Sequence, residues 1–150
     1  MYEAAARSYQ QTSFLTADPM RLILMCYEGA IGNLKKARDS YSKKDYLTKG
    51  MALKKTFDII YELNSSLDVK KGGEVAANLR SLYSYMTQAL TEADLKKDMD
   101  VFDAVIRMLE ELEAGWRSIA ASQPENVKPV LNRVPEASSR SASVGRAWSV

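Results

Sequence analysis

The sequence lacks the residues on which most enzymes and metal sites depend. It contains no histidine, the usual general base near neutral pH and a common nitrogen ligand of metals. Its one cysteine, Cys26, cannot form an intramolecular disulfide, and its apolar neighbours favour a buried, unreactive thiol. Gly72 and Gly73 are not followed by Lys-Ser or Lys-Thr, so they do not indicate a phosphate-binding loop. We therefore expect no catalysis, no cofactor and no bound metal.

Long apolar runs and a strong charge of either sign are also missing. The longest apolar stretch is far shorter than the roughly 20 residues of a membrane span, and the start, "MYEAAARSYQ", has no apolar signal segment. We expect a cytoplasmic chain with no direct membrane insertion. The net charge is only +2. Basic stretches such as "KKAR" and "ALKK" carry no ordered platform of aromatic residues, so nucleic acid is not the expected partner.

The pattern that is present is helical. It predicts four helices, at about 19–41, 46–68, 74–93 and 99–122, with "VKKGGE" as the turn before the third. Asp18 and Pro19 are suited to the cap and first position of the first helix, Asp45 to the cap of the second, and Asp98 or Asp100 to that of the fourth. Because the connections are short, sequential helices should run antiparallel. The sequence thus predicts an all-α, up-down four-helix bundle.

Each predicted helix has an apolar stripe whose residues are three or four positions apart, as a bundle core requires. In chain order, the four stripes consist of Leu22, Ile23, Cys26, Ala30, Leu34 and Ala37; Ala52, Thr56, Ile59, Ile60, Leu63 and Leu67; Val75, Leu79, Leu82, Met86, Leu90 and Ala93; and Phe102, Val105, Leu109, Leu112, Trp116 and Ile119.

The first two predicted helices carry more apolar surface than a core stripe needs. In the second, Leu53, Phe57 and Tyr61 widen the apolar arc to roughly 200°, whereas an ordinary surface helix needs only a little over about 100°. In the first, Met25 is one of the apolar residues outside the stripe. Such a surplus either forms an exposed patch for a partner or is covered by the ends of the chain.

The composition divides the chain into three parts. Residues 18–123 form the predicted bundle, and residues 1–17 form an expected flexible N-terminal arm. Residues 124–150 are rich in Ser, Arg and Pro, so we expect a disordered tail. The arm contains Tyr9 and Phe14 and is the better candidate to cover the surplus apolar surface.

Several blocks of sequence occur in a specific order: "YQQT", "TADP", "LILMCYEGAI", "IIYELNSSLD" and "ANLRSLYSYM", with Trp116 near the end of the last helix. Together they make residues 9–120 similar to the FliS family, the flagellar export chaperones that bind flagellin. Cys26 stands where the family more often has leucine, which keeps the position apolar. The tail after Pro124 lies outside the resemblance.

The resemblance implies an antiparallel bundle whose outer apolar grooves receive the C-terminal segment of flagellin, which is disordered until it binds. It also implies that the chaperone prevents premature polymerisation and delivers flagellin to the type III export apparatus, where a flagellar export gate protein recognises it. The arm residue Tyr9 is assigned to the gate contact or to covering the groove. The groove is assigned to Met25, Leu53, Phe57, Ile60, Tyr61, Leu82, Tyr83 and Met86.

The residues alone leave two other functions open. The spare apolar stripes could pair with a second copy in a self-associating structural bundle, and sedimentation of the protein would detect such a dimer. The basic stretches could instead belong to an RNA-binding regulator, which would show salt-dependent binding to RNA. The sequence does not decide the oligomeric state.

Overall fold

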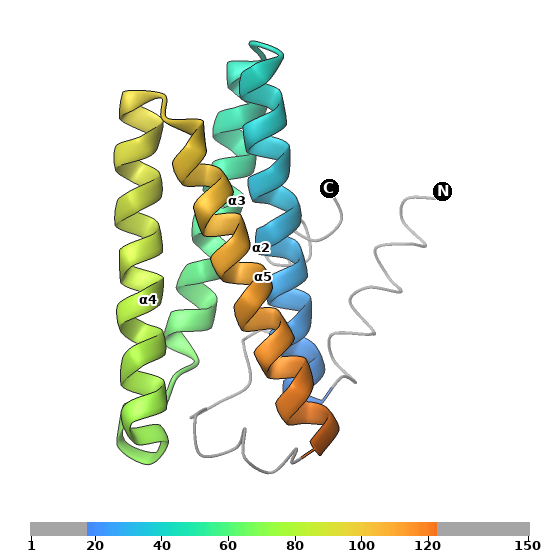
Figure 1. Cartoon of the computed structure of the whole chain (residues 1–150), viewed down its shortest axis with the longest axis vertical. Helices are drawn as coiled ribbons and strands as arrows, with labels where there is room; N and C mark the ends of the chain where they lie inside the picture. Colours follow the sequence, from blue (N-terminus) through green and yellow to red (C-terminus); the bar gives the residue numbers. More distant parts are fainter. Residues whose placement is uncertain (1–17, 123–150) are drawn as a thin grey trace.

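The computed structural model describes residues 18–122, so the predicted arm (1–17) and tail (124–150) lie outside the described residues. The described chain forms four α-helices: α2 (Pro19–Ser42), α3 (Tyr46–Ser65), α4 (Val69–Lys96) and α5 (Met99–Ser122). Each helix runs antiparallel to the one before it (Figure 1). This confirms the predicted all-α, up-down bundle.

All four helices begin directly after an aspartate. In each case the carboxylate accepts a backbone N–H from the first turn, which satisfies one of the groups that a helix start leaves unpaired. The predicted caps Asp18 and Asp45 are confirmed, and Asp98, not Asp100, precedes α5. The four bonds are Arg21 N to Asp18 at 2.8 Å, Thr48 N to Asp45 at 3.1 Å, Lys71 N to Asp68 at 3.0 Å and Asp100 N to Asp98 at 3.2 Å.

The start of α4 differs from the prediction. The second predicted helix was expected to continue to about Asp68, but α3 ends at Ser65 and Asp68 caps α4 instead. The expected turn over "VKKGGE" is helical at first and breaks at Gly73, whose backbone has φ 57° and ψ −133°. Glycine adopts a positive φ without the clash that a Cβ would cause. Val75 follows this kink and is 56% exposed, so its predicted place in the core is wrong.

The core lies between the four helices and matches most of the predicted stripes. Every stripe residue predicted for α2 and α3 is buried. In α5 the stripe is buried at four positions, while Leu112 is half-buried and Ile119 is 37% exposed. Ile119 lies in the last turn of α5, where the helix has moved away from α4 (Figure 1). The apolar stripe therefore extends beyond the part of α5 that the bundle covers.

A hydrogen-bonded aromatic cluster crosses the centre of the bundle. The indole N–H of Trp116 on α5 donates to the hydroxyl of Tyr27 on α2, at 3.0 Å. The same hydroxyl lies 2.5 Å from that of Tyr83 on α4. Tyr27 is fully buried, and Tyr83 is 2% exposed. Burial raises the pKa of Tyr27 to about 12, although the bonds to Tyr83 and Trp116 act in the opposite direction.

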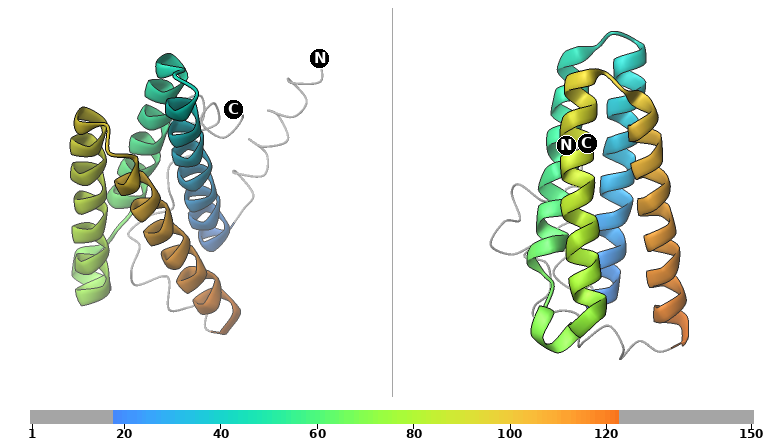
Figure 2. Two further views of the ribbon diagram at one scale, coloured as in Figure 1. Left: turned by 45° about the horizontal axis from the view of Figure 1, so that its top comes forward. Right: turned by 60° about the vertical axis from the view of Figure 1, so that its left-hand side comes forward.

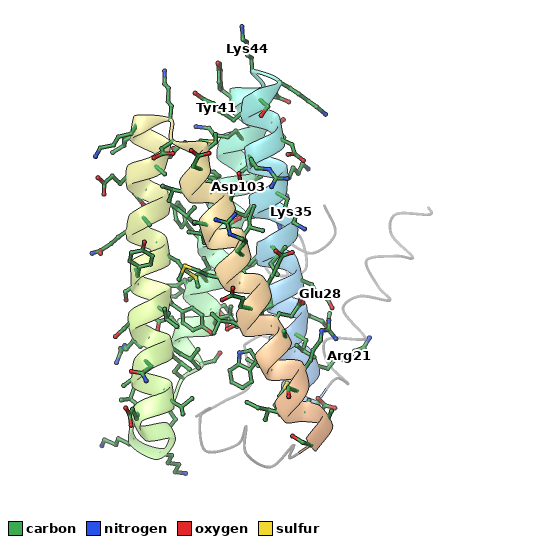
Figure 3. All side chains as sticks on the ribbon, viewed as in Figure 1. Arg21, Glu28, Lys35, Tyr41, Lys44 and Asp103 are labelled. Carbon is green, nitrogen blue, oxygen red and sulfur yellow. The ribbon has the colours of Figure 1, made fainter. Side chains whose placement is uncertain are left out.

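Ion pairs line the contact between α2 and α5. They join Arg38 to Asp103 at 2.9 Å, Lys35 to Glu110 at 3.4 Å and Glu28 to Arg117 at 2.9 Å. Figure 3 shows Glu28 and Lys35 along α2, with Asp103 beside them on α5. Each of these side chains is substantially exposed, so each pair contributes little to the free energy of folding.

Helix α4 has looser contacts with its neighbours than α2 has with α3 or α5. Figures 1 and 2 agree that α4 and α5 are close at the turn that joins them and diverge toward the start of α4 and the end of α5. Among the described residues, no helix is long and apolar enough to cross a membrane.

Candidate binding surface

Half of the predicted groove residues belong to the core. Lys49 on α3 pairs with Asp94 on α4 at 2.5 Å, which identifies the side of α3 that faces α4. Leu53 and Ile60 lie four and eleven residues after Lys49 and therefore share this side. On α4, Tyr83 points inward to Tyr27. Placing these residues in an outer groove is thus corrected, since the exposed fractions are 4% for Leu53, 1% for Ile60, 2% for Tyr83 and 0% for Met86.

The other four predicted groove residues reach the surface but do not form one patch. Phe57 is half-buried and Tyr61 is 60% exposed, one turn apart on α3. Met25 is half-buried on α2. Leu82 is half-buried on α4, one turn before the exposed Tyr85, on the side that adjoins α5. Only the α3 pair remains together.

The α3 pair extends into a stripe that is not part of the predicted groove. Tyr46 is eleven residues before Phe57, so at about 100° per residue it lies within about 20° of it on the helix. Tyr61 lies about 40° further round. We call Tyr46, Phe57 and Tyr61 the α3 stripe. Tyr46 is 55% exposed. Its position could have been recognised from the same helical projection that identified Phe57 and Tyr61.

Two further exposed apolar residues lie near the start of α3. Leu47 is 76% exposed and Met51, one turn later, is 55% exposed. Nearby on the outer side of α2 and α3, burial and then the charge of Lys36 lower the pKa of Lys55. Burial is the larger cause of this shift, and the contribution of Lys36 shows that these two lysines lie near each other. The surplus apolar surface of α3 is thus real, but it lies further round the helix than predicted.

A second apolar region lies between α4 and α5, near the turn that connects them. It contains a depression of about 320 Å³ whose lining includes Tyr85, Ala89 and Val101. Glu92 and Asp98 supply carboxylates to the lining. Tyr85 is 56% exposed, so this ring is available to a partner.

The described residues offer binding surface rather than reactive groups. Between residues 18 and 122, no cluster of three or more His, Cys, Asp or Glu side chains could hold a metal ion. The thiol of Cys26 is 1% exposed, and burial, followed by the charge of Glu62, raises its pKa. A buried neutral thiol is a poor nucleophile. What the arrangement can do chemically is bury apolar side chains of another segment.

A four-helix bundle with its own complete core and with exposed aromatic side chains outside it belongs to the class of helical binding proteins. The sequence model of the family described as "Flagellar protein FliS" matches residues 1–123. The chain belongs to the FliS family.

Individual relatives agree with this assignment. The chain is 36% identical over 120 residues to the flagellar secretion chaperone FliSB of Pseudomonas aeruginosa, covering 77% of this chain and 95% of the relative. It is 36% identical over 126 residues to FliS of Salmonella typhimurium, covering 80% and 93%. It is 30% identical over 116 residues to FliS of Bacillus subtilis, covering 77% and 86%. The family and these names support a flagellar secretion chaperone rather than an enzyme.

Proposed function

We propose that this chain is a cytoplasmic export chaperone that binds the disordered C-terminal segment of flagellin on the outer apolar surface of its bundle. Binding would prevent premature polymerisation and present flagellin to the flagellar type III export apparatus. Membership of the FliS family supports the chaperone class. The observation that carries the binding proposal is the α3 stripe, because Tyr46 and Tyr61 are each more than half exposed and do not belong to the core, against which Phe57 packs.

The physical argument concerns the cost of ordering the cargo. An amphipathic segment laid against an apolar surface buries the face that would otherwise pair with other flagellin chains. Ordering a disordered segment consumes roughly 2 to 5 kcal/mol or more of the interaction energy. A long contact surface offsets this cost. Phe57 and Tyr61 form the centre of the proposed contact. Met25 on α2 and Leu82 on α4 lie apart from it, so only a longer segment that wraps around the bundle would also contact them.

The α3 stripe can be tested without disturbing the core. Replacing Tyr61 with Asp alters a side chain that is 60% exposed, so the fold should be retained, as judged by circular dichroism. We expect at least about a tenfold loss of affinity for a flagellin C-terminal peptide, because a central aromatic contact is worth about 2 kcal/mol or more. The matched control is Leu95→Asp, since Leu95 is 79% exposed on α4. Unchanged peptide binding by Tyr61→Asp would remove the α3 stripe from the proposal.

The contact with the export gate protein is assigned to Tyr9, which lies outside the described residues. Deleting residues 2–17 should leave flagellin affinity equal or higher if this arm covers apolar surface. The same deletion should weaken binding to the gate protein. Markedly weaker flagellin binding after the deletion would contradict the covering role, while unchanged gate binding would contradict the role of Tyr9.

A further inference from the structure

The face formed by α4 and α5 presents apolar side chains that no described residue covers. Tyr85 and Val75 on α4 are each 56% exposed, and Ile119 on α5 is 37% exposed. Between them, Leu82 and Leu112 are half-buried. The depression of about 320 Å³ lies at the closed end of this face, and the two helices diverge toward its open end (Figures 1 and 2).

The chain itself continues from the open end of this face. Helix α5 ends at Ser122, and the family match ends at residue 123, so residues 124–150 are not part of the shared chaperone domain. Within them, the stretch "NVKPVLNRVP" at residues 126–135 has apolar side chains at positions i, i+3, i+4 and i+7. Segments that dock in apolar grooves through one face have this spacing. The four residues are Val127, Val130, Leu131 and Val134.

The charges of the segment and the face are complementary. Lys128 and Arg133 are the only charged residues between positions 127 and 134, so the segment carries two positive charges. The depression on the α4–α5 face is lined by the carboxylates of Glu92 and Asp98 and by one basic side chain, Lys96, which pairs with Glu92. Attraction between opposite charges fixes the orientation of a docked segment, while the apolar contacts supply most of the free energy of binding.

The connecting chain is long enough for the segment to reach this face. Residues 123–126 can span about 14 Å when extended, at about 3.4 Å per residue. Measured back along α5 from Ser122, that distance equals about nine residues of helix rise. The segment can therefore begin close to the level of Leu112 and continue toward Tyr85 and the depression.

We propose that residues 127–134 of this chain bind the α4–α5 face and occupy its apolar surface when no other partner does. The segment would thus compete with any other partner that binds this face. This inference does not depend on flagellin binding, because both the segment and the face belong to one chain.

The test uses the full chain with a spin label at position 132. The chain has one native cysteine, Cys26, whose side chain is 1% exposed. The spin label should therefore react with the thiol introduced by Asn132→Cys. In the isotopically labelled protein, the oxidised label should attenuate the amide signals of Tyr85, Ala89 and Val101, and reducing the label should restore them. The amide of Met51 on α3 should keep its intensity. Attenuation centred on α3, or no localised attenuation, would overturn the proposal.

Two pairs of matched variants in the labelled protein test the chemistry of the contact. Leu131→Asp should remove the attenuation, whereas Val144→Asp, the same change in charge outside the segment, should retain it. On the face, Tyr85→Asp should remove the attenuation and Tyr61→Asp should not. Equal behaviour within either pair would show that the docking is not the one proposed.

A mixing experiment separates this occupant from a second copy of the chain. Isotopically labelled protein without a spin label is mixed with spin-labelled protein of natural isotope content. Attenuation in this sample would arise between chains, which would overturn the intramolecular proposal. Unattenuated signals in the mixture, with attenuation in the singly labelled chain, would support it. Because flagellin is absent from these samples, neither result bears on the proposed cargo.

Discussion

The buried hydroxyl of Tyr27 is the residue at which the smallest chemical change should have the largest effect on stability. Tyr27→Phe removes one oxygen and leaves the ring in place. Two buried groups then lose their hydrogen-bond partner in the cluster: the indole N–H of Trp116 and the hydroxyl of Tyr83. Each buried polar group left without a partner costs about 1 to 3 kcal/mol. We therefore expect Tyr27→Phe to lower the free energy of unfolding by about 2 to 5 kcal/mol.

Tyr83→Phe is the matched comparison. It also removes one buried hydroxyl, but Tyr27 still accepts the bond from Trp116, so the expected loss is only about 1 kcal/mol. Urea unfolding followed by circular dichroism at neutral pH measures both losses. If the free energy of unfolding falls with urea concentration at the same slope in both variants, the two variants unfold comparably. The reasoning would be refuted if Tyr83→Phe were as destabilising as Tyr27→Phe, or if Tyr27→Phe were neutral.

Three further predictions concern single groups. The pKa of the Tyr27 hydroxyl is about 10 in the unfolded chain and is raised to about 12 in the folded chain. Its contribution to the free energy of unfolding should therefore be present below pH 10 and be lost between pH 10 and 12. The urea midpoint should fall less over this range in Tyr27→Phe than in the unaltered protein. Cys26 should resist iodoacetamide in the native protein and react after unfolding, as mass spectrometry can show, and rapid native labelling would contradict its burial. Asp68→Ala should cost about 1 kcal/mol in urea unfolding by removing the cap of α4, whereas Asp68→Asn should cost less because its amide oxygen can still accept the Lys71 N–H.

Residue spacing along each helix was sufficient to predict the bundle. Every residue that the period of three and four assigned to the core stripes of α2 and α3 is buried, although Tyr27, Ile31 and Leu53 also belong to the core and were not included. Aspartate with proline identified the start of α2. These features depend on neighbours within one helix. The break at Gly73 was harder to predict from the sequence. A pair of glycines indicates a turn, but it does not indicate that a helical turn capped by Asp68 comes before it.

The candidate surface was harder to predict because exposure depends on which helix lies beside which. Leu53 and Tyr61 belong to the same apolar arc of α3, yet one is 4% and the other 60% exposed. The difference arises from the position of α4, which is marked by the pair of Lys49 and Asp94. Helical periodicity gives the width of an apolar arc, but the packing of a second helix decides which part of it remains outside.

The three ion pairs between α2 and α5 specify alignment even though each contributes little to stability. Sliding α5 along α2 by seven residues, about 10 Å, would bring Glu28 opposite Glu110 and leave Arg117 without its acid. The apolar residues of the two helices recur at similar intervals and would tolerate such a slide more readily than the charges. The charged edge of the bundle thus sets the register of α5 against α2, because the observed register places each of these charges opposite one of the other sign.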